Sequence, residues 1–293
     1  MNEAYARFQA QAEVFQCPLC HQRMILDEKG SFHCAKGHCF DMARKGYVNF
    51  APNQKQTQYD TALFAHRRAV FAAGCYAEVA HTLGQWVLRE TTRRASFRVL
   101  DAGCGEGYYT DALAQNDAMA AKGHLFGVDL AKEAIQLATG YSSPAHWLVG
   151  NLANLPFSEG SFDVVLDVLT PANYEEFFRV LRPDGVLIKV VPGSDYLREI
   201  RDQVAEQLVH KQYANDRVID YLEQNAQVLE RKTLRYTCPV TSALWSHFLQ
   251  MTPMTTQVAL TDALAPDAVT IHMEVIKARR RRIRSPRSAQ SAR

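Results

Sequence analysis

A short apolar run that ends in three closely spaced glycines constrains the fold of this 293-residue chain more than any other feature. Residues 97–102 (FRVLDA) predict a strand, residues 103–107 (GCGEG) predict a tight loop, and a helical pattern begins at about Tyr108. Glycines in such a loop let the backbone approach a ligand closely at the start of the following helix. This strand–loop–helix unit is typical of nucleotide-binding α/β sheets. The three glycines are Gly103, Gly105 and Gly107.

The chain on either side of this loop alternates between helical and strand patterns. Residues 63–92 predict a helix that breaks at Gly74. Further strands are predicted at 125–129, 146–149, 162–168, 186–191, 228–236 and 269–276, with helices at 131–139, 173–181 and 195–212. Strands that alternate with helices favour a mostly parallel sheet covered by helices. We therefore predict an α/β fold with a seven-stranded, Rossmann-like sheet.

The spacing of acidic residues around the loop indicates the kind of ligand. Asp129 ends the second strand, twenty-two residues beyond Gly107, where its carboxylate can accept hydrogen bonds from both ribose hydroxyls. A dinucleotide fingerprint requires Gly-x-Gly-x-x-Gly, but here the third glycine comes one residue early and Tyr108 takes its place. The early glycine together with Asp101 favours a positively charged ligand without phosphate, S-adenosylmethionine. A nicotinamide-dependent oxidoreductase is the alternative from another class.

Two later strands add candidate residues. Asn151 follows the third strand, where the edge of an adenine would need a hydrogen-bond partner. Asp167 lies near the carboxyl end of the fourth strand, where the reactive methyl group should point. Asp163 begins the same strand and is expected to cap or pair locally.

Four of the seven cysteines lie between residues 17 and 39. Cys17 and Cys20 form a C-x2-C pair, and Cys34 follows after thirteen residues. Two such pairs separated by a linker are typical of a structural zinc site, in which four ligands complete a tetrahedron. The spacing leaves His38 and Cys39 open as the fourth ligand and favours His38. We expect the remaining thiols, Cys75, Cys104 and Cys238, to be reduced.

Charge is distributed unevenly along the chain. From Lys277 onward there are eight basic residues and no acidic ones, so residues 1–276 carry a net charge of −6. The tail is either a disordered, solvated extension or a source of non-specific RNA affinity. Arg44 and Lys45 lie among aromatic residues in the stretch 40–50, which could either stack on RNA bases or pack the module. Residues 51–62 are polar and are interpreted as a linker.

No apolar run approaches the ~18 residues of a membrane span, and the first residues do not resemble a secretory signal. We therefore expect a cytoplasmic protein without a membrane partner. The sequence does not determine the oligomeric state and leaves a homodimer open.

Taken together, the motifs CPLC…CAKGH, FDMARKGYVNF, RRAVFAAGCY, DAGCGEGYYT and LPFSEGSFD resemble a known family. They are similar to the RlmA-like bacterial 23S rRNA (guanine-N1)-methyltransferases, in particular to the Gram-positive, tylosin-resistance-type branch. The resemblance implies a class I S-adenosylmethionine-dependent methyltransferase domain (56–276) behind a zinc-ribbon, RNA-recognition module (1–55), with the basic tail (277–293) outside the family pattern. The ribbon would grip a hairpin of 23S rRNA, and the methyl group would go to N1 of a guanine. Some members confer antibiotic resistance to macrolides.

The resemblance also assigns roles to individual residues. The zinc ligands fall on Cys17, Cys20, Cys34 and His38, and the cofactor contacts fall on Tyr76, Gly105, Glu106 and Tyr196. Tyr196 stands where the enteric branch has histidine. For a direct SN2 transfer, Asp167 is the candidate proton acceptor or guanine-edge partner, with a merely solvated residue as the alternative. The alternative functions are methylation of another RNA or of a small molecule, and RNA binding without catalysis.

Overall fold

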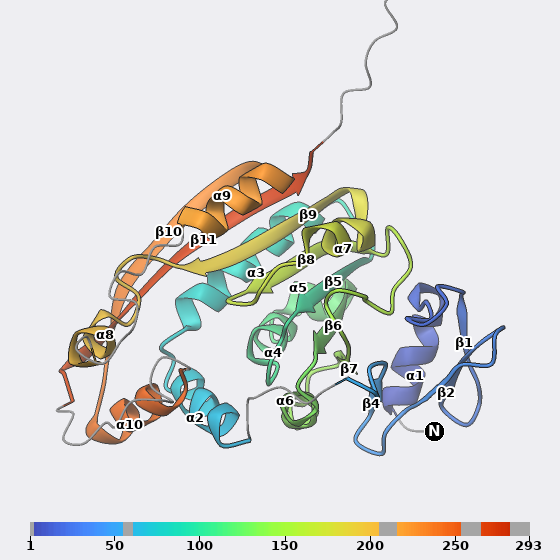
Figure 1. Ribbon diagram of the computed structural model, residues 1–293, viewed down its shortest axis with the longest axis horizontal. Coiled ribbons are helices and arrows are strands. Elements are labelled where there is room, and N and C mark those ends of the chain that lie inside the picture. Colours follow the sequence, from blue (N-terminus) through green and yellow to red (C-terminus); the bar gives the residue numbers. More distant parts are fainter. Residues whose placement is uncertain (1–2, 55–60, 205–215, 253–264, 282–293) are drawn as a thin grey trace, which may run out of the picture.

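The computed structural model describes residues 3–54, 61–204, 216–252 and 265–281. A twisted sheet runs through the middle of the molecule, and the chain's amino-terminal part lies at one end of it (Figure 1). The sheet contains eight strands among the described residues, in the order β10-β11-β9-β8-β5-β6-β7-β4. Their bounds are β4 Tyr47–Asn49, β5 Phe97–Ala102, β6 Gly123–Asp129, β7 His146–Val149, β8 Phe162–Val168, β9 Leu181–Pro192, β10 Ala226–Pro239 and β11 Ala268–Arg280.

Strands β4 to β9 all run parallel to one another, whereas β11 pairs antiparallel with both β9 and β10. Every residue of β8 is buried, as expected for a parallel strand covered on both faces. The carboxyl ends of the parallel strands therefore meet at one edge of the sheet, which is where α/β sheets bind ligands.

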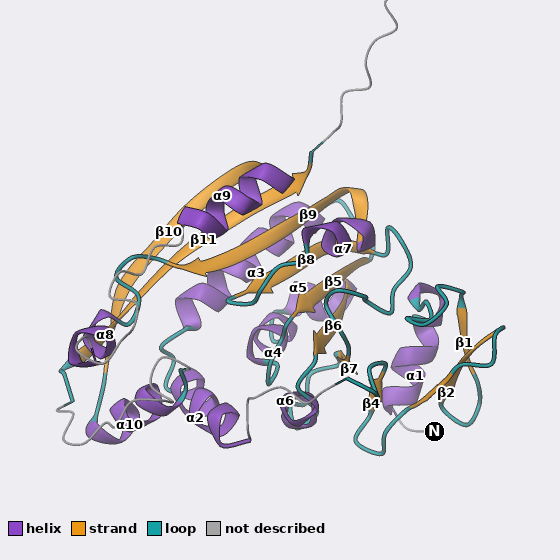
Figure 2. Cartoon of the chain, viewed as in Figure 1, coloured by secondary structure: helices purple, strands orange, loops and turns teal. Residues whose placement is uncertain are grey.

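Helices cover both faces of the sheet (Figure 2). Packing assigns α2 to α6, α8 and α10 to one face and α1, α7 and α9 to the other. The break predicted at Gly74 is confirmed, because α2 and α3 are separate helices. The bounds are α1 Glu3–Ala10, α2 Thr61–Ala72, α3 Ala77–Thr91, α4 Tyr108–Ala114, α5 Asp117–Lys122, α6 Lys132–Ala138, α7 Tyr174–Val180, α8 Arg198–Val204, α9 Asp216–Asn225 and α10 Ser242–Gln250.

The amino-terminal ribbon is built on a small antiparallel sheet of β1 (Met24–Leu26), β2 (Ser31–Cys34) and β3 (Cys39–Asp41), preceded by a short 3-10 turn at Ala12–Val14. The prediction of seven strands is one too few, because β4 follows this sheet in the chain and pairs in parallel with the edge strand β7. Local sequence patterns could not show this pairing, since a three-residue strand is stabilised only by its distant partner. The domain boundary expected at residues 55 and 56 lies outside the described residues.

Two expectations about the carboxyl-terminal half need correction. Strand β11 continues to Arg280, and Lys277 is buried, so the first residues of the expected tail are ordered. The rest of the tail, residues 282–293, lies outside the described residues. Cys75 and Cys238 are not free thiols but form a disulfide, with Cα atoms 5.3 Å apart. The fold brings these cysteines together although 163 positions separate them in the chain.

None of the helices in the described parts of the chain is long and apolar enough to cross a membrane.

Candidate functional site

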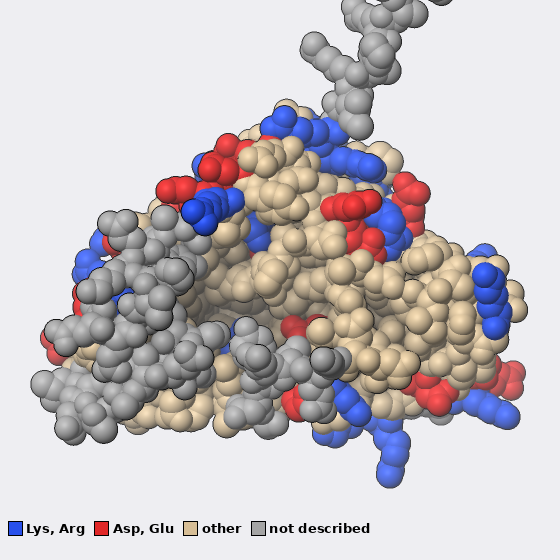
Figure 3. Space-filling model, in the orientation of Figure 1, with Lys and Arg blue, Asp and Glu red and all other residues tan. Residues whose placement is uncertain are grey.

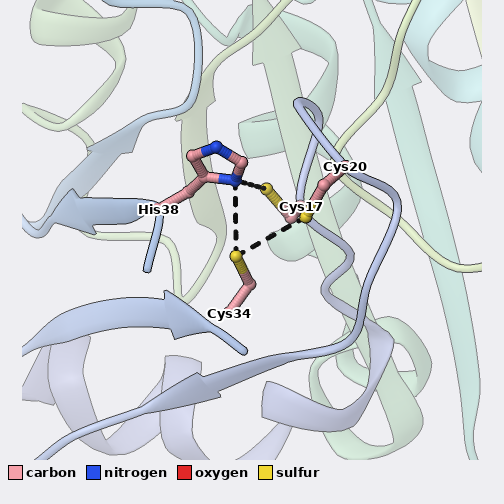
Figure 4. A group of neighbouring side chains, drawn as sticks. All are labelled: Cys17, Cys20, Cys34 and His38. Carbon is pink, nitrogen blue, oxygen red and sulfur yellow. Dashed lines mark hydrogen bonds between the residues drawn. The ribbon is translucent and has the colours of Figure 1, made fainter. Parts of the chain in front are cut away.

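The four predicted metal ligands converge at one end of the ribbon (Figure 4). The ligand atoms of Cys17, Cys20, Cys34 and His38 all lie within 4.8 Å of one another. His38 Nδ1 is 3.4 Å from the sulfur of Cys17 and 3.4 Å from that of Cys34. Three thiolates and one imidazole are a donor set that zinc prefers, and they leave no open position for a catalytic water. This cluster fits a structural zinc ion.

Two tight turns aim these ligands at one point. The first turn is closed by the amide of His21, which donates to the carbonyl oxygen of Cys17. The second is closed by the amide of Gly37, which donates to the carbonyl oxygen of Cys34; Gly37 has a φ of +80° there. Cys39 is exposed, and its sulfur lies 3.4 Å from an oxygen of Asp41, so it does not join the cluster. The alternative fourth ligand is therefore excluded.

The aromatic residues after the metal site pack the module instead of facing solvent. Phe40, Tyr47 and Phe50 are each 4–5% exposed. Arg44 and Lys45 are exposed in the turn before β4. The packing interpretation is thus confirmed for these aromatic rings, whereas the two basic side chains of the stretch 40–50 are exposed and available to a phosphate backbone.

The glycine-rich loop lies between the carboxyl end of β5 and the start of α4. Its first residue, Gly103, donates its amide proton to the carbonyl oxygen of Val128 on β6. A Cβ on Gly107 would lie 2.6 Å from the ring of Trp147, and its φ of +86° also disfavours a side chain. The loop can therefore follow this close path only with glycine at its turning points.

The two aspartates predicted around the loop are both fixed by hydrogen bonds, Asp129 from the loop itself and Asp101 from α4. Asp129 ends β6 and accepts hydrogen bonds from the amides of Gly105 (2.9 Å) and Ala131 (2.8 Å). Asp101 is 2% exposed and accepts a hydrogen bond from the hydroxyl of Thr110 (2.7 Å). Burial raises the pKa of Asp101 to about 7, and it also raises the pKa of Asp129.

Asn151 follows β7 and lies beside Asp129, because the amide of Gly150 donates to the carbonyl oxygen of Asp129. Its side-chain oxygen accepts from the amide of Ala153, which fixes the turn after the strand. The structure thus places Asn151 at the same sheet edge as the glycine-rich loop.

Two tyrosines predicted from the family resemblance meet although 120 positions separate them. The hydroxyl oxygens of Tyr76 and Tyr196 are 2.6 Å apart. Burial and the neighbouring Tyr196 raise the pKa of Tyr76, so the Tyr76 phenol is neutral at ordinary pH. A pair of hydroxyls of this kind can orient a ligand by hydrogen bonding.

Glu106, in the loop, has a buried carboxylate whose surroundings indicate a ligand-binding role. It is 0% exposed, and neither carboxylate oxygen has a hydrogen-bond partner among the described residues. The nearest opposite charge is Arg67 on α2, whose Nε lies 3.4 Å from Oε1. Burial raises the pKa of Glu106, and Arg67 opposes this rise. A buried carboxylate with unfilled hydrogen-bonding capacity is costly unless a ligand fills it.

Asp167 is not solvated, so that alternative is wrong. It is 0% exposed, and Lys189 on the neighbouring strand β9 donates to its Oδ2 at 2.6 Å. The other oxygen is buried without a hydrogen-bond partner in the described part of the chain. Burial raises the pKa of Asp167 to about 6, against the lowering effect of Lys189. Asp163, by contrast, forms ion pairs with Arg182 and Arg94. The expected pairing is confirmed, although these partners are not its neighbours in the chain.

The site as a whole is acidic. Asp101, Glu106 and Asp129 lie in or beside the glycine-rich loop, and Arg67 forms an ion pair with Glu106. The face drawn in Figure 3 is hollowed in its middle, where Figure 1 shows the carboxyl ends of the parallel strands. An acidic hollow with little compensating charge suits a cationic ligand better than a pyrophosphate.

Sequence reasoning missed three residues of this region. Arg67 is the first residue of the motif RRAVFAAGCY, but nothing in the sequence indicated what its side chain binds. Lys189 is a single lysine in an otherwise apolar strand, VLIKVV, and that isolation is a signal for a buried partner. Thr110, which holds Asp101, carried no recognisable signal.

The sheet, the glycine-rich loop and the ribbon together define an S-adenosylmethionine-dependent methyltransferase with an amino-terminal structural zinc site. Comparison with known families agrees: the family described as "RlmA, N-terminal" matches residues 15–58, and a methyltransferase domain matches residues 94–249.

Several characterised or named proteins are similar along most of their length. YxjB of Bacillus subtilis, provisionally named a 23S rRNA (guanine-N1)-methyltransferase, is 35% identical over 82% of this chain and 86% of its own. The 23S rRNA (guanine(748)-N1)-methyltransferase of Streptomyces fradiae is 30% identical over 76% of this chain and 78% of its own. A Micromonospora griseorubida protein with a provisional name of the same kind is 31% identical over 77% and 81%. The chain belongs to the RlmA-like family of 23S rRNA (guanine-N1)-methyltransferases.

Proposed function

We propose that this protein transfers a methyl group from S-adenosylmethionine to N1 of a guanine in a hairpin loop of 23S rRNA, by direct SN2 displacement. The observation that carries the proposal is Glu106, a buried carboxylate with unfilled hydrogen-bonding capacity in an acidic glycine-rich loop. A buried carboxylate of this kind suits a ligand with a positively charged group that donates hydrogen bonds. The family relatives supply the choice of RNA and of guanine N1.

The residues around the loop fit the parts of S-adenosylmethionine. Glu106 would hold its ammonium group and Arg67 its carboxylate, since the two side chains form an ion pair that a zwitterion can complement. Asp129 would accept from the ribose hydroxyls, and Asn151 would lie at the adenine. When bound, the cofactor supplies an electrophilic methyl group on a sulfonium. Tyr76 and Tyr196 would orient the amino-acid end by their hydroxyls.

The guanine that accepts the methyl group must first lose a proton. Guanine N1 carries a proton, so its lone pair becomes available only as that proton leaves. Asp167 is the candidate proton acceptor, because one of its carboxylate oxygens is buried without a hydrogen-bond donor in the parts of the chain that the structure describes. Lys189 holds the other oxygen and fixes the direction of the carboxyl group. Asp167→Asn should lower turnover while leaving RNA binding intact; normal turnover would remove Asp167 from the chemistry.

The amino-terminal module, residues 1–55, would grip the RNA. Its exposed Arg44 and Lys45 suit contacts with phosphates, while its aromatic side chains are used in packing. The target base must leave its stack to reach the methyl group, which is easier from a loop than from a duplex.

Primer extension on ribosomal RNA tests the proposal. N1 methylation blocks the Watson–Crick edge and stops the polymerase, so the stop maps the modified guanine. RNA from cells that express the protein should show a stop that is absent from cells lacking it and from cells with Asp129→Ala. Identical patterns in all three would refute the proposal.

The cytoplasmic location, the homodimer and macrolide resistance stay predictions. Fractionation, sedimentation of the full chain and the tylosin sensitivity of the same cells would test them.

A further inference from the structure

The residue that directly follows β8 has an unusual backbone conformation. Leu169 has a φ of +57°, in the left-handed region that leucine rarely adopts. Its side chain is nevertheless 38% exposed, so burial of the leucine does not offset the strain. Leu197 also has a positive φ, but it is completely buried, and packing there compensates for the backbone. Backbone strain that is not offset by burial of the side chain tends to occur at functional positions.

Several contacts hold Leu169 in this conformation. Its amide donates to the carbonyl oxygen of Val190 on β9 at 3.0 Å. The next residue, Thr170, has its carbonyl oxygen 3.2 Å from Nζ of Lys189, the same buried ammonium that binds Asp167. The buried ion pair therefore fixes the backbone that presents the leucine.

The same segment touches the glycine-rich loop. A Cβ on Gly103 would lie 2.4 Å from the hydroxyl of Thr170, so the side chain of Thr170 packs directly against the backbone of the loop. Leu169 is thus adjacent to the loop that would hold the methyl donor, at the carboxyl end of a central strand. An acceptor that reaches the carboxyl end of β8 would meet Leu169 there.

We propose that Leu169 is the apolar platform against which the target guanine packs after it has left its stack. The inference rests on the proposed function and names the residue that receives its substrate. Enzymes that modify a base hold the extruded ring between aromatic or apolar side chains, because every base has a flat, weakly polar face. An exposed leucine held rigidly beside the donor supplies such a face.

Three variants test the platform. Leu169→Ala removes the apolar surface and keeps the strained backbone, whereas Leu169→Gly removes the surface and relieves the strain. Leu229→Ala is the matched control, because Leu229 on β10 is 37% exposed and lies on the edge strand at the far end of the sheet. Each protein is assayed for methyl transfer to unmodified 23S rRNA, for binding of S-adenosylhomocysteine and for melting temperature.

We expect both substitutions at position 169 to lower kcat/KM for rRNA by roughly 5- to 150-fold, the range of one base-stacking contact. The affinity for S-adenosylhomocysteine should stay unchanged, and Leu169→Gly should melt higher than Leu169→Ala. Leu229→Ala should match the wild type in kcat/KM. The loss of activity would then not follow the loss of stability, because the more stable Leu169→Gly would be impaired as well, which a merely structural role would not produce.

Wild-type kcat/KM in both position-169 variants would overturn the platform, and so would a parallel loss of S-adenosylhomocysteine affinity. If the wild-type protein itself does not methylate 23S rRNA, the proposed function fails first. The two failures are therefore distinguishable.

Discussion

The ion pair between Arg67 and Glu106 leads to a quantitative prediction about cofactor binding. Replacement of Arg67 by Gln removes the charge proposed to hold the cofactor's carboxylate. Hydrogen bonds to charged groups contribute about 1.5–3 kcal/mol. The Arg67 side chain is 32% exposed, so solvent weakens the interaction and we take the lower part of that range. A loss of about 2 kcal/mol corresponds to a ~30-fold weaker Kd.

Calorimetry with two ligands isolates this contact. S-adenosylhomocysteine carries the amino-acid end, whereas 5′-methylthioadenosine lacks both its carboxylate and its ammonium group. Arg67→Gln should weaken the first ligand about 30-fold and leave the Kd of the second unchanged. Arg68→Gln is the matched control on the same helix, because the Arg68 guanidinium lies 4.8 Å from the ring centre of Tyr141 and not beside Glu106 in an ion pair.

Two results would refute this reasoning. An equal loss for both ligands would mean that Arg67 maintains the shape of the site and does not read the carboxylate. An unchanged Kd for S-adenosylhomocysteine would mean that the carboxylate binds elsewhere.

Three further predictions concern stability. Burial raises the pKa of Asp101 to about 7, so the folded carboxyl retains a proton that the unfolded chain has lost; the unliganded protein should lose up to about 4 kcal/mol between about pH 4 and pH 7. Asp101→Asn should remove this contribution and flatten the fall in stability measured in denaturant titrations, leaving the smaller part that Asp167 adds; an unchanged pH dependence would contradict it. A strong chelator should release one zinc ion per chain and lower the melting temperature, and Cys34→Ser should show neither effect because its site is already broken. Replacement of both Cys75 and Cys238 by Ala should lower the free energy of unfolding by about 2–5 kcal/mol without reductant, since the disulfide closes a long loop. With reductant, the variant and the wild type should be equally stable. Equal stability without reductant would show that the disulfide does not form.

Local patterns predicted the central strands well. The bounds of β5, β7 and β8 are those expected from the sequence, because each is a short apolar run between turn residues. The metal cluster was also predictable, since its ligands lie within 22 residues and depend on two tight turns. Features of this kind are encoded by neighbours in the chain.

Features that depend on distant segments were not predictable. The disulfide, the pairing of β4 with β7 and the Asp167–Lys189 ion pair each join parts of the chain that come together only in the folded sheet. Spacing alone predicted that Asp167 lies near the carboxyl end of β8, but not that it would form a buried ion pair with Lys189. A charged residue in an apolar strand is the signal to use, because such a residue requires a partner.

The pairing of β4 with β7 changes how the two modules should be regarded. Phe15 of the ribbon packs against Phe126 and Phe157 of the methyltransferase domain, with ring centres 6.2 and 5.5 Å apart. The ring of His146, on β7, stacks on Phe126, and its Nε2 lies 3.1 Å from the carbonyl oxygen of Arg7 on α1. Because the ribbon and one face of the sheet share this aromatic core, the metal cluster cannot move far relative to the glycine-rich loop without disrupting packing. A rigid connection of this kind sets a fixed distance between the module proposed to grip the RNA and the loop proposed to hold the methyl donor.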